Sequence, residues 1–168
     1  FRPEAISVEN GKIYAAASKV SVNSEGVLFE HEQHKQINIS SDCYITIRLN
    51  PPFNSTYITS MYLLAKYACD SVVLNDPLSI INFPEKIIPK ELYEFMPNTL
   101  ITKNKDQIMT FWEKHSDIVI KPLYDFGGRG VFLLKKGEKN YKTILEMLFE
   151  KYNEPLMVQK FIPEVTKG

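Results

Sequence analysis

Apolar and polar residues alternate over residues 44–49, which predicts a strand with one buried face. Pro51 and Pro52 follow and end this strand, because proline cannot donate to a β-ladder. The residues expected on the buried face are Ile45, Ile47 and Leu49.

A helix and a second strand are predicted next. Asn54 is a typical helix N-cap, and apolar residues follow it at helical spacing as far as Ala68. The β-branched run at residues 71–74 predicts a short strand. A strand–helix–strand order is the signature of a parallel α/β sheet, whose ligands bind beyond the carboxyl ends of the strands. Arg48 and Asn50 fall at those ends.

The region before this unit has a weaker pattern. Residues 12–17 and 19–22 predict two short strands, after an Asn10-Gly11 turn signal. Residues 24–40 are polar and irregular, and we expect them to form a surface loop.

The second half of the chain alternates short strands with helices. We place a domain boundary near residues 80–84, where Asn, Phe and Pro interrupt the pattern, and expect domains at 1–82 and 83–168. The predicted fold class is therefore α/β. The expected strands are 99–102, 118–121, 130–134 and 156–162, and the expected helices are 105–114 and 141–152.

Composition narrows the class of protein. Twenty basic and twenty acidic residues cancel, so a bulk positive field for nucleic acid is not expected. No apolar run approaches the roughly 18–20 residues of a membrane span, and no signal-peptide pattern is present, so we expect a cytoplasmic protein. Cys43 and Cys69 are isolated, which indicates neither a disulfide framework nor a zinc site. The chain begins with Phe1 and ends at Gly168 after a strand-like run, and we expect it to be an internal piece of a longer protein.

The main candidate for chemistry is the segment from residue 118 to residue 134. A strand ends in Lys121-Pro122, and Gly127-Gly128-Arg129-Gly130 precedes a return strand. Glycines let backbone N–H groups approach a phosphate, and a lysine at the strand end reaches the same phosphate as a point charge. A plain hairpin with a glycine turn explains this stretch equally well.

Two further candidates are weaker. Residues 156–163 indicate a buried strand with an exit turn, whose edge can pair with a flat heterocycle while Phe161 and Ile162 pack beside it. Considered alone, Lys86 is expected to be a solvated surface lysine.

Taken together and in order, these motifs resemble the bacterial glutathione synthetases of the ATP-grasp superfamily. Residues 48–54 (RLNPPFN) resemble that family's R-x-D-P-P-F-D, and residues 97–102 (PNTLIT) its P-x-T-L-V-T. The other matching stretches are 75–80 (NDPLSI), 85–86 (EK), 111–123 (FWEKHSDIVIKPL), 127–128 (GG) and 159–163 (QKFIP).

The resemblance implies part of a Rossmann-like pre-ATP-grasp domain followed by the first part of an ATP-grasp domain. It implies ATP-dependent ligation of γ-glutamylcysteine to glycine through an acyl phosphate, in a homotetramer that uses Mg²⁺ or Mn²⁺. The metal ligands would lie beyond Gly168. By position, phosphate-binding residues would be Lys86, Lys121, Gly127 and Gly128; adenine-binding residues Gln159, Lys160, Phe161 and Ile162; and substrate-binding residues Arg48 and Asn50.

The chain departs from this family at several positions. Asn50 and Asn54 stand where the family has aspartates, and Tyr124-Asp125-Phe126 precedes Gly127 where Asp-Gly is usual. These differences leave two alternatives open: another ATP-grasp carboxylate–amine ligase with a different acceptor, or a non-catalytic nucleotide-binding remnant. We expect the 168-residue chain alone to be inactive.

Overall fold

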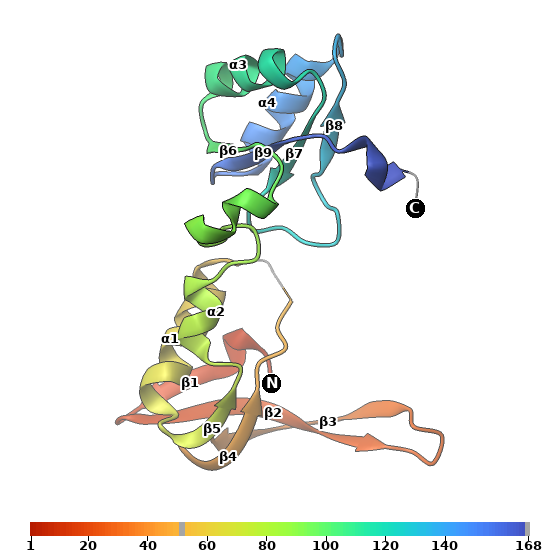
Figure 1. Cartoon of the computed structure of the whole chain (residues 1–168). Coiled ribbons are helices and arrows are strands. Elements are labelled where there is room, and N and C mark those ends of the chain that lie inside the picture. Colours follow the sequence, from red (N-terminus) through yellow and green to blue (C-terminus); the bar gives the residue numbers. More distant parts are fainter. Residues whose placement is uncertain (51–52, 167–168) are drawn as a thin grey trace. The chain divides into compact units, whose positions relative to one another are not determined.

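The computed structural model describes residues 1–50 and 53–166, in two compact units, Phe1–Phe83 and Pro84–Gly168 (Figure 1). We call them unit 1 and unit 2. Each unit combines helices with strands, so the predicted α/β class is confirmed. The predicted strand end at Pro51 and Pro52 lies outside the described residues.

Unit 1 begins with a 3₁₀ turn, η1 (Pro3–Ala5), and an antiparallel sheet of β1 (Ile6–Glu9), β2 (Lys12–Val22) and β3 (Leu28–Asn38) in that order. The β1–β2 turn holds Asn10 and Gly11 at φ of 50° and 76°, as a two-residue hairpin requires.

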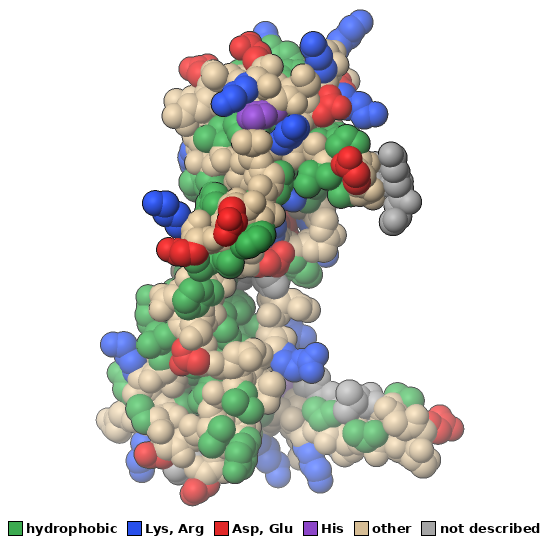
Figure 2. Space-filling model, viewed as in Figure 1, with side chains coloured by type: hydrophobic (Ala, Val, Ile, Leu, Met, Phe, Trp, Pro, Cys, Tyr) green, Lys and Arg blue, Asp and Glu red, His purple; other side chains and the backbone are tan. Residues whose placement is uncertain are grey.

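Two predictions for this region were wrong. The two short strands predicted at residues 12–22 form one strand with a bulge between Ser18 and Val20. The loop predicted at residues 24–40 is largely β3. Its outer part pairs only with β2, and Figure 1 shows this ribbon extending from the rest of unit 1. Figure 2 shows hydrophobic and polar side chains intermixed on the ribbon, and Val20, Val22 and Val27 are exposed. Residues 33–38 of β3 are all exposed, and a strand segment of that kind lacks the alternation that identifies a strand in a sequence.

The strand–helix–strand prediction is confirmed. β4 (Ser41–Thr46) pairs in parallel with β5 (Asp70–Leu74), and α1 (Ser55–Tyr67) connects them. The Asn54 side chain caps α1 by accepting a 3.0 Å hydrogen bond from the Tyr57 N–H. A short helix, α2 (Pro77–Asn82), follows β5.

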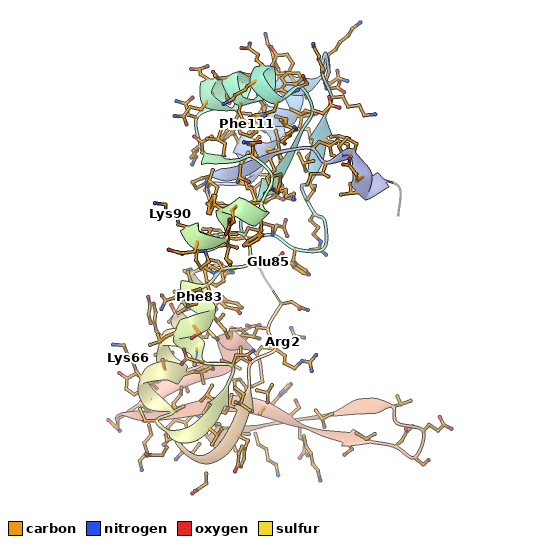
Figure 3. The ribbon with its side chains drawn as sticks, in the orientation of Figure 1. Arg2, Lys66, Phe83, Glu85, Lys90 and Phe111 are labelled. Atoms are coloured by element: carbon orange, nitrogen blue, oxygen red, sulfur yellow. The ribbon has the colours of Figure 1, made fainter. Side chains whose placement is uncertain are left out.

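The core of unit 1 lies between α1 and the strands. Ile45 and Ile47 are buried and Tyr44 is exposed, as the alternation predicted. Lys66, labelled in Figure 3, occupies the last turn of α1, where a positive charge is favourable. Met61 and Leu64 of α1 pack with Ile13 and Ala15 of β2.

Unit 2 is built on a four-stranded antiparallel sheet in the order β6-β9-β7-β8. In chain order, the elements are η2 (Lys90–Phe95), β6 (Thr99–Thr102), α3 (Lys105–His115), β7 (Ile118–Pro122), β8 (Phe132–Leu134), α4 (Tyr141–Lys151), β9 (Leu156–Lys160) and η3 (Pro163–Thr166).

No helix among residues 1–50 and 53–166 has the length and apolar character needed to cross a bilayer.

The two faces of this sheet differ in chemistry. Figure 1 shows α3 and α4 on one side of the sheet, where Ile118 and Ile120 of β7 are fully buried. Because side chains alternate along a strand, Val119 and Lys121 point to the opposite face. The residues that complete the core under the helices include Ile108, Trp112, Leu134, Leu145, Leu148, Leu156 and Val158.

We predict that Leu148→Ala lowers the free energy of unfolding by roughly 2–5 kcal/mol, because it leaves a cavity beneath α4. Leu148 is 2% exposed, whereas its neighbour Met147 is 57% exposed. The control Met147→Ala should change the unfolding free energy by less than about 0.5 kcal/mol. Urea unfolding can be followed by the fluorescence of Trp112, the single tryptophan, which lies in the same core. Equal effects of the two substitutions would contradict the assigned core.

Candidate functional site

A cleft lies on the face of the unit 2 sheet away from α3 and α4. Its volume is about 420 Å³, a size within the range of small-molecule sites. Val119 pairs across the sheet with both Leu133 and Gln159, so the floor is a continuous row of side chains. The lining residues are Pro97, Val119, Lys121, Val131, Leu133, Gln159, Lys160, Phe161, Ile162 and Val165.

Lys121 brings a positive charge into this mostly apolar cleft. Its Nζ donates a 2.7 Å hydrogen bond to Oε1 of Gln159. Burial, and after it the positive charge of Lys86, lower the pKa of Lys121. A second ammonium group is therefore near Lys121, and an anion bound between the two would relieve both effects.

The orientation of Gln159 is set by a chain of hydrogen bonds. The Thr99 hydroxyl donates to the Pro97 carbonyl at 2.7 Å, so its oxygen is left to accept from Nε2 of Gln159 at 3.0 Å. That contact turns Oε1 toward Lys121, since an amide has its donor and acceptor on opposite arms. Sequence reasoning placed Gln159 beside a ligand and missed Thr99. The structure assigns both arms of the Gln159 amide to protein partners.

Lys86 lies in the segment that enters unit 2. Its side chain is 16% exposed, so it is not the solvated lysine that its sequence context suggests. The ammonium donates a 2.7 Å hydrogen bond to the Asp125 carbonyl at the start of the glycine loop. The carboxylate of Glu85, labelled in Figure 3, lies 3.8 Å from the Lys86 Nζ but is largely exposed, so this pair is weak.

The glycine loop connects β7 to β8, which are antiparallel as predicted. Gly127 and Gly128 have φ of 63° and 73°, and a Cβ on either would meet open space. Gly130 has φ of 68°, and a Cβ there would lie 2.5 Å from the Tyr152 hydroxyl oxygen and 2.8 Å from Pro122 Cγ. The two tip glycines are needed for their backbone conformation, and Gly130 is needed for space as well.

Asp125 anchors the loop to the end of α4. The Tyr152 hydroxyl donates to Oδ2 of Asp125 at 2.8 Å, and this hydrogen bond lowers the pKa of the carboxyl group. The Phe126 N–H donates to Oδ1 of the same carboxylate at 2.9 Å. Tyr152 is the last residue of the apolar stripe predicted for the helix at residues 141–152. Its hydrogen bond to Asp125 has no signal in the sequence.

The segment after β9 forms one wall of the cleft. The Lys160 N–H donates to the Asn98 carbonyl and the Phe161 N–H to the Asp117 carbonyl, both at 2.9 Å. These bonds hold the strand exit in place beside the apolar side chains of Phe161 and Ile162.

The predicted substrate residues belong to unit 1. Arg48 and Asn50 are exposed and follow the carboxyl end of β4. Arg48 lines a smaller cavity of about 230 Å³, together with Tyr44, Met61 and other unit 1 residues.

The described residues hold no group of three or more His, Cys, Asp or Glu side chains that could bind a metal ion. The chemistry of the unit 2 cleft is instead cationic and apolar. Lys121 lines it among mostly apolar side chains. Lys86 and the tip glycines are not in the lining, but Lys86 is near enough to lower the pKa of Lys121, and Val131 at the exit of the glycine loop lines the cleft. This combination suits a ligand that joins an aromatic ring to anionic groups.

Comparison with known structures defines the class of fold. The chain resembles the crystal structure of D-alanyl-alanine synthetase A from Vibrio cholerae, with a TM-score of 0.56 and 15% identity over 94% of this chain and 48% of that one. Residues 85–168 match the family model described as "Prokaryotic glutathione synthetase, ATP-grasp domain". Unit 2 therefore has the ATP-grasp fold.

Residues 1–80 match the corresponding N-terminal domain model. Over the whole length of this chain, it is 37% identical to a glutathione synthetase of Agrobacterium fabrum and 34% identical to one of Mesorhizobium japonicum. It belongs to the prokaryotic glutathione synthetase family, as the sequence motifs indicated. The chain spans about half the length of the curated relatives it matches, 53% and 54% respectively.

We predict that Gly127→Ala costs about 1–2 kcal/mol of stability, the usual penalty for an L-residue in left-handed backbone. Gly130→Ala should cost clearly more, because its Cβ also collides with Tyr152 and Pro122. Urea unfolding monitored by Trp112 fluorescence compares the two variants. Equal costs would show that the tight contact at Gly130 does not exist.

Proposed function

We propose that the unit 2 cleft binds ATP and that the protein is a ligase that joins γ-glutamylcysteine to glycine. The observation that carries this proposal is the half-buried ammonium of Lys121, held in an apolar cleft beside a second lysine. A desolvated cation with a depressed pKa gains most from an anionic ligand, because a nearby opposite charge restores its charged form.

The phosphates are assigned to Lys86, Lys121 and the tip of the glycine loop. Gly127 and Gly128 keep their Cα positions open to an approaching group, so backbone N–H donors there can reach phosphate oxygens. Lys86 would exchange the Asp125 carbonyl for a phosphate oxygen, a stronger, charge-assisted partner.

The adenine ring is assigned to the slot between the sheet floor and the exit of β9. The amides of Lys160 and Phe161 are already engaged with Asn98 and Asp117. Adenine is therefore assigned to the Lys160 carbonyl and the Ile162 N–H, with Phe161 packing beside the ring. Gln159 serves the site by orienting Lys121, and not by reading the base.

When ATP is bound with Mg²⁺ or Mn²⁺, it supplies a phosphoryl group that converts the carboxylate of the dipeptide into an acyl phosphate open to attack by the glycine amine. This chain contributes the groups that bind and orient the nucleotide. We assign the dipeptide to unit 1 near Arg48 and Asn50, unit 1 to the N-terminal domain of the family, and the reaction to the cytoplasm.

A second candidate is an ATP-grasp ligase with another acceptor, which the asparagines at positions 50 and 54 favour. Asn54 carries little weight, because its side chain caps α1, a role that asparagine and aspartate fill equally well. Asn50 is exposed and does not cap a helix, so the change from aspartate at this position is the observation that favours a different acceptor.

Omission of single reactants from an assay of the complete gene product tests the reaction. ADP release should require Mg²⁺-ATP, γ-glutamylcysteine and glycine together. Lys121→Met, which removes only the ammonium, should weaken nucleotide binding by about tenfold or more, the loss expected for a charge-assisted contact. ATP binding without ADP release in the complete mixture would favour another acceptor. Absence of ATP binding would overturn the proposal.

Thr99→Val tests the orientation of Gln159. Valine has a similar shape but leaves the Pro97 carbonyl and the Gln159 amide without their partner. We expect ATP affinity to fall about fivefold to tenfold, as for the loss of one buried hydrogen bond. The control Thr99→Ser keeps the hydroxyl and should bind like the unsubstituted protein. Calorimetric titration measures the ATP affinity of both variants. Equal affinities would show that the orientation of Gln159 by Thr99 does not contribute to ATP binding.

A further inference from the structure

Tyr152 touches both ends of the glycine loop. At the start of the loop its hydroxyl donates to the Asp125 carboxylate at 2.8 Å. At the end of the loop a Cβ added to Gly130 would lie 2.5 Å from the same hydroxyl oxygen, so the backbone passes directly beside it. Tyr152 itself is fixed, because it is 7% exposed and packs in the core under α4.

Asp125 extends this connection to a third element. Its carboxylate receives the Tyr152 hydroxyl and the Phe126 N–H, while its main-chain carbonyl receives the Lys86 ammonium. One residue thus joins the end of α4, the glycine loop and the entry segment of unit 2. The contact between Asp125 and Tyr152 spans 27 residues of chain.

The tip of the loop takes no part in these contacts. It is formed by Gly127 and Gly128, where an added Cβ would meet open space. The Arg129 guanidinium lies over the Phe126 ring, 5.2 Å from its centroid, and links the two flanks of the tip. The loop is therefore anchored at both ends and open at the part assigned to phosphate.

We propose that Tyr152 and Asp125 are positioning residues for nucleotide binding, which hold the glycine loop and Lys86 ready for the phosphates. This inference rests on the proposed function, because it assumes that the loop and Lys86 bind ATP. Its physical basis is preorganisation. A loop that is ordered before binding does not lose its conformational entropy when the ligand arrives.

The expected signature is selective for phosphate. Tyr152→Phe keeps the ring and its packing and removes only the hydroxyl. We expect affinity for Mg²⁺-ATP to fall about fivefold to tenfold, as for the loss of one hydrogen bond to a charged group, with affinity for adenosine unchanged. Adenosine is expected to occupy the same cleft without contacting the loop, so a change in the loop alone leaves its affinity unchanged. A merely structural role of Tyr152 would disturb the whole cleft and weaken the binding of both ligands.

A double-mutant cycle tests whether Tyr152 and Asp125 act as one unit. Asp125→Ala should weaken ATP binding at least as much as Tyr152→Phe, because it also removes the acceptor of the Phe126 N–H, and the double variant should be no weaker than Asp125→Ala alone. Asp125→Asn keeps one acceptor oxygen, enough for the Tyr152 hydroxyl but not also for the Phe126 N–H, and should bind ATP more tightly than Asp125→Ala. Tyr141→Phe is the matched control, because Tyr141 lies on the same helix and packs against Trp112 instead of the loop.

Calorimetric titration of the complete gene product with Mg²⁺-ATP and with adenosine gives every value in the cycle. If the unsubstituted protein binds ATP and Tyr152→Phe binds it equally well, the inference fails while the proposed function stands. Additive effects of the two single substitutions, or a parallel loss of adenosine binding, would also overturn the inference. If the unsubstituted protein binds no ATP, the proposed function fails and the inference falls with it.

Discussion

The structure of unit 2 depends on the alternation of side chains along β7. Ile118 and Ile120 enter the core beneath α3 and α4, and the same two-residue period sends Val119 and Lys121 to the opposite face. An ammonium group in that position loses hydration, and its pKa falls because of burial and of Lys86. Within residues 1–50 and 53–166, the ammonium has a neutral acceptor, Oε1 of Gln159, and no carboxylate pairs with it. The positive charge of the cleft therefore remains available to an anionic ligand.

The parts of the fold that were predicted from sequence are those with a buried face. The parallel β4–α1–β5 unit and the four strands of unit 2 each place apolar residues against a helix, and that burial produces a regular period in the sequence. The β2–β3 ribbon has no such constraint over its outer part. Backbone pairing with β2 defines it, and such pairing leaves no hydrophobic period in residues 24–40.

The candidate site was predicted in outline and missed in detail for a related reason. Lys121 and the glycines are adjacent in the chain, so a local motif contains them. Thr99 and Tyr152 act through hydrogen bonds to residues 60 and 27 positions away, and only the folded sheet brings these partners together. Gln159 was named as a residue beside the base, whereas its amide is committed to Lys121 and Thr99. Thr99 lies in β6 and Tyr152 ends α4, so each is an ordinary strand or helix residue in the sequence.

The central claim is that adenine and phosphates occupy the cleft on the open face of the unit 2 sheet. Photolabelling of the complete gene product with an azidoadenine analogue of ATP, followed by peptide mapping, tests it most directly. The account predicts covalent label on the peptide that contains Phe161 and Ile162, and loss of that label when unmodified ATP competes. Label that ATP displaces from a different part of the protein, with none on this peptide, would contradict the account.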